Sequence, residues 1–262
     1  MAVTMDEFVQ LVEGLAPPEL ACGWDNSGLL LRCGETVNRV LIALDATMAV
    51  ADEAAPGGYD MLLVHHPTLF SPVKALDHRQ PTDAVIMKLI HSGISLYAAH
   101  TTYDKAHGGI NDVLAQKLGL ADIRVASGPD EGMMRVGELA QPLDRNAFLE
   151  RVKRALGENA VRASGWAGGQ VRTVAVLGGS GGDFAAAAKL AGADALVTGE
   201  AKHHQFLEAA ALGLLLVEAG HYATEHGFVD GIFMSLQSRL NEVQLLLDLK
   251  MADYETVPYE IV

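Results

Sequence analysis

The chain has 262 residues, half of them apolar, and its 33 acidic residues against 19 basic ones give a formal net charge of −14. This length allows one large domain or two ordinary ones with a sizeable core, and the negative charge disfavours nucleic acid as a partner. The two cysteines make no disulfide framework, and neither a signal peptide nor a membrane-spanning run is evident. We therefore expect a cytoplasmic protein without nucleic-acid or membrane partners.

In its first half the sequence alternates between helical patterns and short apolar runs. Thr4 and Glu7 resemble a capping box that opens a helix, which Pro17 and Pro18 end. The pattern then predicts strands at 39–45, 61–64 and 95–100 and helices at 47–55, 82–91 and 110–118. Strands that alternate with helices indicate βαβ units and a largely parallel sheet.

A polar, turn-rich stretch at 127–132 is the predicted boundary between two lobes, residues 1–127 and 128–262. The second lobe is expected to contain strands at 134–139, 171–177, 195–198, 214–217 and 243–249, and helices at 145–156, 183–191 and 222–240. We expect an α/β fold of two interlocked lobes with largely parallel sheets and a metal site in the cleft between them.

Three of the predicted strands are followed by histidines, and two of these histidines have a carboxylate shortly after them. The residues are His65 and His66, His100 with Asp104, and His221 with Glu225. Ligands of open α/β sheets bind at the carboxyl ends of the strands, so these side chains are expected to converge. Their chemistry suits a borderline divalent cation such as Zn, Mn, Fe, Co or Ni. The pattern predicts a site for more than one ion, and two ions about 3.5–4 Å apart would activate a water molecule and stabilise an oxyanion.

Each part of this pattern also has a simpler explanation. Adjacent side chains on a strand point to opposite faces, so His65 and His66 share a site only where the strand ends and the backbone turns. Otherwise they are polar residues of a loop. His221 and Glu225 lie four residues apart, where they would alternatively cap a helix or interact with its dipole. Asp104 is an ordinary loop residue apart from its proximity to His100.

Two further segments are candidates for lining a substrate pocket. The run at 178–182 joins a predicted strand to a predicted helix, and Gly179, Ser180 and Gly181 would either present backbone N–H groups to a phosphate or form a tight turn. His204, after His203, would line the same crevice or sit at a helix start. The glycine run is not a Walker A motif, and the absence of His-Glu-x-x-His and Gly-x-Ser-x-Gly argues against the common metalloproteases and serine hydrolases.

Seven short segments, in order along nearly the whole chain, are similar to a known family. They are Gly23–Leu29, Val64–Pro67, Ala98–Thr101 with Asp104, Gly108–Asp112, Gly178–Gly181, Val197–Glu200 and Ala219–Glu225. Together they resemble the dinuclear-metal family of GTP cyclohydrolase 1 type 2 homologues, related to the NGG-interacting-factor-like proteins. Two positions depart from the family pattern. Thr102 and Tyr103 replace the usual Asn-Leu before Asp104, and His203 stands where the family often has Tyr.

The resemblance implies two divalent ions per chain, a position near them for His100, and a toroidal homohexamer built as a trimer of dimers. The implied ligands are His65, His66, Asp104, His221 and Glu225, with Glu225 bridging the ions. We expect a metal-dependent hydrolase of a nucleotide or another phosphorylated small molecule, similar to GTP cyclohydrolase, in which His100 transfers protons. The alternative is a non-enzymatic metal-binding or regulatory protein, and a pocket beside the ligands would favour the enzyme.

Overall fold

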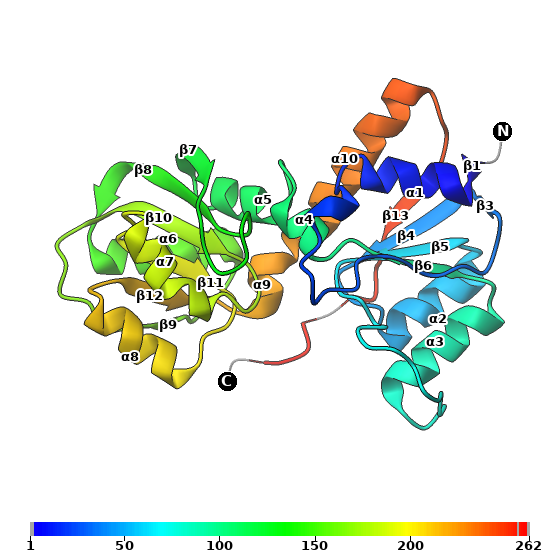
Figure 1. Cartoon of the computed structure of the whole chain (residues 1–262), viewed down its shortest axis with the longest axis horizontal. Coiled ribbons are helices and arrows are strands. Elements are labelled where there is room, and N and C mark those ends of the chain that lie inside the picture. The colour runs from blue at the N-terminus through cyan, green and yellow to red at the C-terminus, as the bar shows by residue number, and fades with distance from the viewer. Residues whose placement is uncertain (1–2, 256, 261–262) are drawn as a thin grey trace. The chain divides into compact units, whose positions relative to one another are not determined.

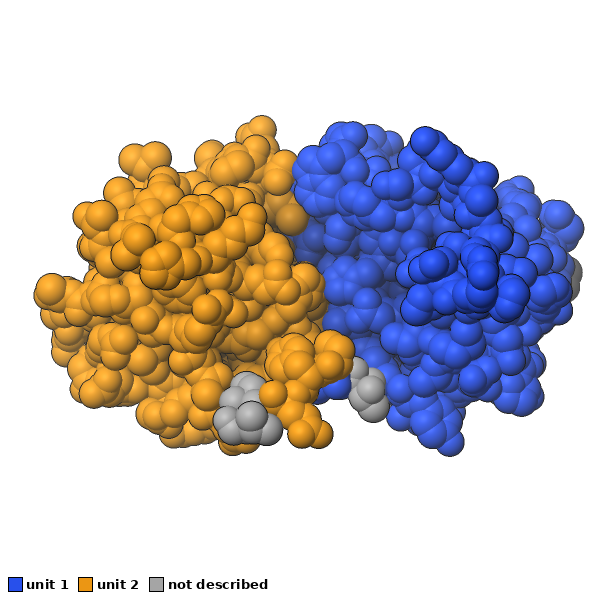
Figure 2. All heavy atoms as spheres, turned by 90° about the horizontal axis from the view of Figure 1, so that it is seen from below, with its two compact units in different colours: residues 1–106, 228–257 blue, residues 107–227, 258–262 orange. Residues whose placement is uncertain are grey.

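The computed structural model describes residues 3–255 and 257–260 and divides the chain into two compact units (Figure 1, Figure 2). Unit 1 comprises Met1–Ala106 and Phe228–Val257, and unit 2 comprises His107–Gly227 and Pro258–Val262. The chain therefore enters unit 2 at His107, ahead of the predicted boundary at residue 127, and most of the segment after Gly227 returns to unit 1. The turn-rich stretch at 127–132 is a connection between two strands of unit 2, so its composition marked a loop and not a lobe boundary.

Unit 1 is built on a five-stranded sheet with the order β13-β4-β5-β6-β2. The strands are β2 (Gly28–Leu31), β4 (Arg39–Ala43), β5 (Met61–Val64), β6 (Ser95–Ala98) and β13 (Asp248–Met251). The pairs β13–β4, β4–β5 and β5–β6 are parallel, and only β2 runs antiparallel to its neighbour. Every residue of β5 and β6 is buried, as expected for strands covered on both faces.

The helices of unit 1 bury apolar side chains that the sequence places at helical spacing. The longer ones before residue 107 are α1 (Met5–Glu13), α2 (Met48–Gly57) and α3 (Pro81–His91). Thr4 and Glu7 form the predicted capping box of α1, and the Thr47 side chain caps α2. One core cluster joins Val50 of α2 and Leu89 of α3 to Leu62 of β5. The shorter elements are β1 (Val3–Thr4), β3 (Thr36–Val37), η1 (Pro18–Leu20) and α4 (Thr101–Lys105).

Unit 2 contains a six-stranded sheet with the order β7-β8-β10-β11-β12-β9. The strands are β7 (Leu120–Val125), β8 (Arg135–Leu143), β9 (Arg162–Ala163), β10 (Val171–Leu177), β11 (Ala195–Thr198) and β12 (Leu215–Glu218). The central strands β10, β11 and β12 are parallel, whereas β7, β8 and β9 pair antiparallel with their neighbours. This sheet is therefore mixed and less parallel than predicted. Strands β7 and β8 follow one another as an antiparallel pair, whereas β9 pairs with β12 although the two lie far apart in sequence.

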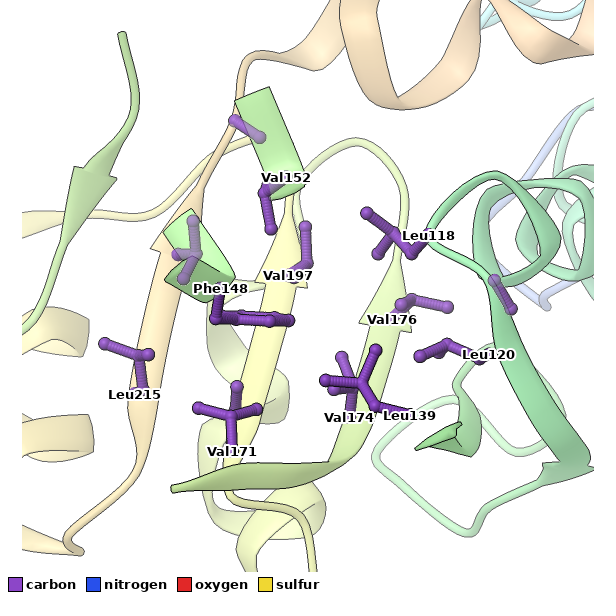
Figure 3. Close-up of a cluster of buried hydrophobic side chains, with 14 of the residues drawn as sticks. Leu118, Leu120, Leu139, Phe148, Val152, Val171, Val174, Val176, Val197 and Leu215 are labelled. Atoms are coloured by element: carbon purple, nitrogen blue, oxygen red, sulfur yellow. The ribbon is translucent and has the colours of Figure 1, made fainter. Parts of the chain in front are cut away.

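The helices of unit 2 before Gly220 are α5 (Ile110–Lys117), α6 (Arg145–Leu156), η2 (Gly182–Phe184), α7 (Ala185–Leu190) and α8 (His203–Ala211). Phe148 and Val152 of α6 pack with Leu118 against Val176 and Val197 of the sheet (Figure 3). This apolar layer fixes the strands whose carboxyl ends carry the polar residues of unit 2. The predicted α/β class is confirmed for both units.

The predicted long helix at 222–240 is in fact two helices. They are α9 (His221–Glu225) and α10 (Gly227–Val243). Gly220 precedes α9 with a φ of +89°, a conformation that favours glycine, and Gly227 lies against Val113, where a side chain would be crowded. The predicted strand at 243–249 is also shorter and later, as β13. Among the described helices, none is both long and apolar enough to cross a membrane.

Candidate metal centre

The parallel strands of unit 1 deliver their following residues to one edge of the sheet. Strand β5 lies between β4 and β6, with Val64 paired to Ala43 and Ala98. The pairing continues past the strands, because the His65 backbone N–H donates to Leu44 O at 3.1 Å and Ala99 N–H donates to Val64 O at 2.9 Å. The histidines that follow β5 and β6 are thereby brought together, as the strand-end argument predicted.

His65, His66 and His100 form a group that we call the histidine cluster. Each contributes one ring nitrogen, and these nitrogens lie within 4.8 Å of one another. The rings are close, with centroids of His65 at 4.9 Å from His66 and 5.2 Å from His100. Three imidazoles at this spacing are a donor set for a borderline divalent cation.

The second nitrogen of each ring is held by an acceptor. Nδ1 of His65 faces Ala99 O at 2.9 Å, Nδ1 of His66 faces Asp45 Oδ1 at 2.8 Å, and Nδ1 of His100 faces Asp25 Oδ1 at 2.7 Å. A carbonyl or carboxylate oxygen can only accept, so Nδ1 carries the proton in all three rings. A ring held in this way can present the lone pair of Nε2, which is the usual arrangement of metal-binding histidines.

Asp104 belongs to the same part of unit 1, although not as the loop residue that the sequence indicated. It lies in the short helix α4, which begins directly after His100, and it is buried. Its Oδ1 lies 3.7 Å from Nε2 of the fully buried His65. Metal–ligand bonds of about 2.0–2.2 Å leave neighbouring ligand atoms roughly 3–4 Å apart. The separation fits a cation held by both side chains.

Asp25 is a functional residue that the sequence reasoning left unassigned. Its side chain has no exposed surface and accepts hydrogen bonds from His100, Ser27 and Thr101. Burial alone would raise the pKa of Asp25, but these hydrogen bonds outweigh burial and hold the pKa well below its ordinary value of 3.8. An ionised carboxylate therefore fixes the His100 ring. The only sequence signal was its place in the Gly23–Leu29 segment.

Unit 2 contributes a second polar group at the carboxyl ends of its parallel strands. His221 and Glu225 lie on the single turn of α9, and His221 Nε2 is 2.8 Å from Glu225 Oε2. His221 Nδ1 faces Glu200 Oε1 at 3.0 Å. A hydrogen bond from the Ser180 hydroxyl, and to a smaller extent the His221 ring, lower the pKa of Glu200 against the opposing effect of burial. Two carboxylates thus flank one imidazole, and Glu200 is a further residue to which the sequence reasoning gave no role. Its only sequence signal was its place in the Val197–Glu200 segment.

The glycine run does not form the anticipated phosphate cradle. The N–H groups of Gly178, Gly179 and Gly181 already donate to side-chain oxygens of Asn111 (2.8 Å), Thr224 (3.2 Å) and Thr198 (2.8 Å). Gly179 has a φ of +60°, and a Cβ there would lie 2.2 Å from Glu225 Oε1. These glycines allow the backbone to approach Glu225, so the loop lies against the carboxylate of this residue and does not offer its N–H groups to a phosphate.

A cavity of about 360 Å³ lies beside His221 in unit 2. Its ionisable lining consists of Glu158, Glu200, Glu218, Arg162, His221 and Tyr259. Burial raises the pKa of Glu218, although its ion pair with Arg162 opposes the shift. Three carboxylates against one guanidinium make this cavity unfavourable for another anion. His204 is not among the lining residues and is exposed, with His203, on the first turn of α8.

A family model described as Duf34/NIF3 (NGG1p interacting factor 3) matches residues 3–258. The chain belongs to this family. It is 37% identical to a GTP cyclohydrolase 1 type 2 homolog of Nostoc sp. over 86% of each chain, and 30% identical to one of Clostridium perfringens over 98% of this chain and 99% of the relative. A solved structure of a Bacillus cereus protein related to NIF3 has a TM-score of 0.93 and 26% identity, with full coverage of both chains.

Membership in the Duf34/NIF3 family confirms the resemblance that the sequence segments indicated. The structure adds that four of the predicted residues, namely His65, His66, His100 and Asp104, lie in unit 1, and that His221 and Glu225 share one helical turn in unit 2. Among the residues that the structure describes, these belong to the His, Asp and Glu groups that could hold a metal ion.

Proposed function

We propose that this Duf34/NIF3 protein is a dinuclear metal-dependent hydrolase that acts on a nucleotide or another phosphorylated small molecule, in the manner that the GTP cyclohydrolase name of its relatives suggests. The observation that carries the proposal is the histidine cluster, in which every Nδ1 is held by an oxygen acceptor. Metal-binding histidines typically have their second ring nitrogen held by an acceptor in this way.

The proposed ligands are those that the resemblance implies, namely His65, His66, Asp104, His221 and Glu225. The two carboxylate oxygens of Glu225 suit a bridging position. The 2.8 Å separation of His221 Nε2 and Glu225 Oε2 is close to the distance of about 3 Å between neighbouring ligands of one ion. Zn, Mn, Fe, Co and Ni all accept this donor set.

Bound ions would supply an activated water molecule and positive charge against a developing oxyanion. In our proposal His100 moves the proton, because its ring lies within the histidine cluster and is oriented by Asp25 at 2.7 Å. An ionised carboxylate beside an imidazole fixes its tautomer and stabilises the ring while it carries a proton. His100 and Asp25 would thus act as a pair.

The cavity beside His221 supports a small-molecule substrate over a purely structural role for the metals. Its three carboxylates favour a neutral, donor-rich part of the substrate and disfavour a phosphate at the same place. We therefore propose that any phosphate of the substrate binds outside this cavity, and that Glu218 and Arg162 contact an uncharged group.

Elemental analysis tests the metal centre. The purified protein, after dialysis against each of the five metals, should carry about two divalent ions per chain. His66→Ala and Glu225→Ala should lower this content. His91→Ala, which removes an exposed histidine of unit 1, should leave it unchanged. A protein that retains no metal under any of these conditions refutes the proposal.

Turnover of nucleotides and phosphoesters by the loaded protein tests the reaction. His100→Gln should reduce turnover by roughly 10²–10⁴-fold while metal content stays nearly intact, whereas His66→Ala should reduce both. Loss of metal in the His100 variant would make His100 a ligand instead. If no nucleotide or phosphoester is hydrolysed with any of the five metals, a non-enzymatic metal-binding or regulatory role replaces the hydrolase.

A further inference from the structure

Two large aromatic side chains lie exposed beside the histidine cluster. Trp24 is 52% exposed and Phe70 is 49% exposed. Their ring centroids are 6.2 Å apart, and each ring meets His100 edge-on, at 6.1 Å from Trp24 and 6.5 Å from Phe70. We call Trp24 and Phe70 the aromatic platform. Half-exposed aromatic rings beside a polar site are an uncommon use of apolar surface and indicate a binding function.

The platform is held rigidly relative to the histidine cluster. Asp25, which follows Trp24, accepts hydrogen bonds from His100 Nδ1 at 2.7 Å and from the Thr101 hydroxyl at 2.5 Å. Asn26 donates through Nδ2 to Leu69 O and so ties the Phe70 loop to the same segment. A buried carboxylate and a side-chain-to-backbone hydrogen bond therefore hold the backbone next to both aromatic residues, while their rings stay exposed. Such preorganisation is what a binding site requires and what a loosely exposed loop lacks.

We propose that Trp24 and Phe70 bind the planar, nitrogen-containing heteroaromatic ring of the substrate, a nucleobase or a ring of similar size, and present its edge to His100. This inference rests on the proposed function and specifies its substrate class. Aromatic faces stack on any flat π-system without needing a charge. Neither side chain of the platform carries a charge, so the uncharged ring of the substrate suits this place better than its phosphate does.

A heteroaromatic ring also agrees with the position of the aromatic platform next to His100. A ring stacked on Trp24 or Phe70 has His100 as its immediate neighbour, so its edge meets the histidine cluster at which water would be activated. A protein partner seated on the same residues would instead block the histidines. The ring is therefore the occupant consistent with a working metal site.

Tryptophan fluorescence provides a direct binding test, because the chain has only two tryptophans, Trp24 and Trp166. In a Trp166→Phe background Trp24 is the sole indole. Guanosine and adenosine, which carry the ring without phosphate, should quench its emission saturably. Ribose 5-phosphate, which carries the phosphate without the ring, should not. Calorimetry with the unmodified protein should give the same order of affinities.

Variants separate stacking from a general effect on the fold. Phe70→Ala should weaken nucleoside binding by about 10- to 100-fold, and Phe70→Tyr should restore it. Ile90→Ala removes a similarly exposed side chain from α3 (45% exposed) and should leave binding unchanged. Metal content should be the same in all three variants, because none of these residues is a proposed ligand.

Each outcome decides one proposal. Absence of saturable quenching up to millimolar nucleoside, or equal effects of Phe70→Ala and Ile90→Ala, overturns the ring site. A fall in molecular mass of the Trp24→Ala and Phe70→Ala proteins by light scattering would show a subunit contact and overturn it as well. Nucleoside binding without any hydrolysis would support the ring site and refute the proposed hydrolase function. Phosphoester hydrolysis without nucleoside binding would support the hydrolase function and refute the ring site.

Discussion

Three histidines of the candidate site, His66, His100 and His221, are each oriented by one carboxylate that lies far from the histidine in sequence. Asp25 is separated from His100 by 75 residues and Glu200 from His221 by 21. Strand ends predict the histidines themselves, because the sheet rule applies to every parallel strand. Asp25 lies before β2, which is antiparallel to its neighbour, so the rule does not apply to it. Glu200 does follow the parallel strand β11, but the sequence gave no sign of which histidine it would contact. The sequence likewise places Asp45 at the end of a predicted strand but does not indicate its contact with His66.

At the scale of one residue, Asp25 makes stability dependent on pH. Its pKa is lowered in the folded protein, so its contribution is present above the ordinary value of 3.8 and is lost as the pH falls below it. Asp25→Asn would also turn an amide N–H₂ toward the Ser27 and Thr101 donors. We expect this variant to lose about 2–3 kcal/mol of unfolding free energy at pH 7, and the difference from the wild type to shrink as the pH falls toward 2.

Urea denaturation in the presence of EDTA measures this difference without a contribution from metal release. Asp52→Asn is the matched control, because Asp52 is exposed and pairs only across the surface with Lys88 at 2.9 Å. Its effect should be about 1 kcal/mol or less. An Asp25→Asn penalty that stays constant, or grows, between pH 7 and pH 3 would contradict the assignment.

At the scale of an element, the loop from β10 to η2 is shaped by its neighbour α9. The sequence predicted β10, the turn after it and an Ala-rich helix. It did not predict that the turn packs onto Glu225, because that contact joins residues 46 positions apart. It also extended one helix through 222–240, since apolar periodicity continues across the break before Gly227. Local pattern thus predicts which elements exist better than where they end.

Gly179→Ala tests whether this loop positions Glu225. A Cβ at this position would lie 2.2 Å from Glu225 Oε1 and 3.4 Å from His221 Cε1, so the carboxylate must move. We expect metal affinity, measured by calorimetry, to fall by roughly 10- to 100-fold. Gly213→Ala is the control, because Gly213 has a similar φ of +66° with nothing within 4 Å of the added Cβ. Gly213→Ala should lower the free energy of unfolding by about 1–2 kcal/mol and leave the metal affinity unchanged. Equal affinities in the two variants would refute the positioning role.

At the scale of the whole molecule, the chain passes from unit 1 to unit 2 and back again. The return at Phe228 places α10 largely with unit 1, and the sequence offered no cue for it because no turn-rich stretch marks the crossing. The family segments, by contrast, span both units, so they predicted the fold class without locating the boundary. The family resemblance therefore predicts the fold class, whereas the local sequence pattern predicts individual helices and strands.

The last prediction concerns assembly. The resemblance implies six copies arranged as three dimers, and several large apolar side chains, including Leu190 and Leu246 at 90% exposure, remain on the surface of the single chain. Association is the usual way to cover such surface. Light scattering at micromolar concentration should give about 167 kDa, which is six times 27.8 kDa. Dilution or mild urea should release a species of about 56 kDa, two chains, before the monomer appears, because the contacts within a dimer and between dimers differ. A monomer at micromolar concentration, or dissociation directly into single chains, would contradict the trimer of dimers.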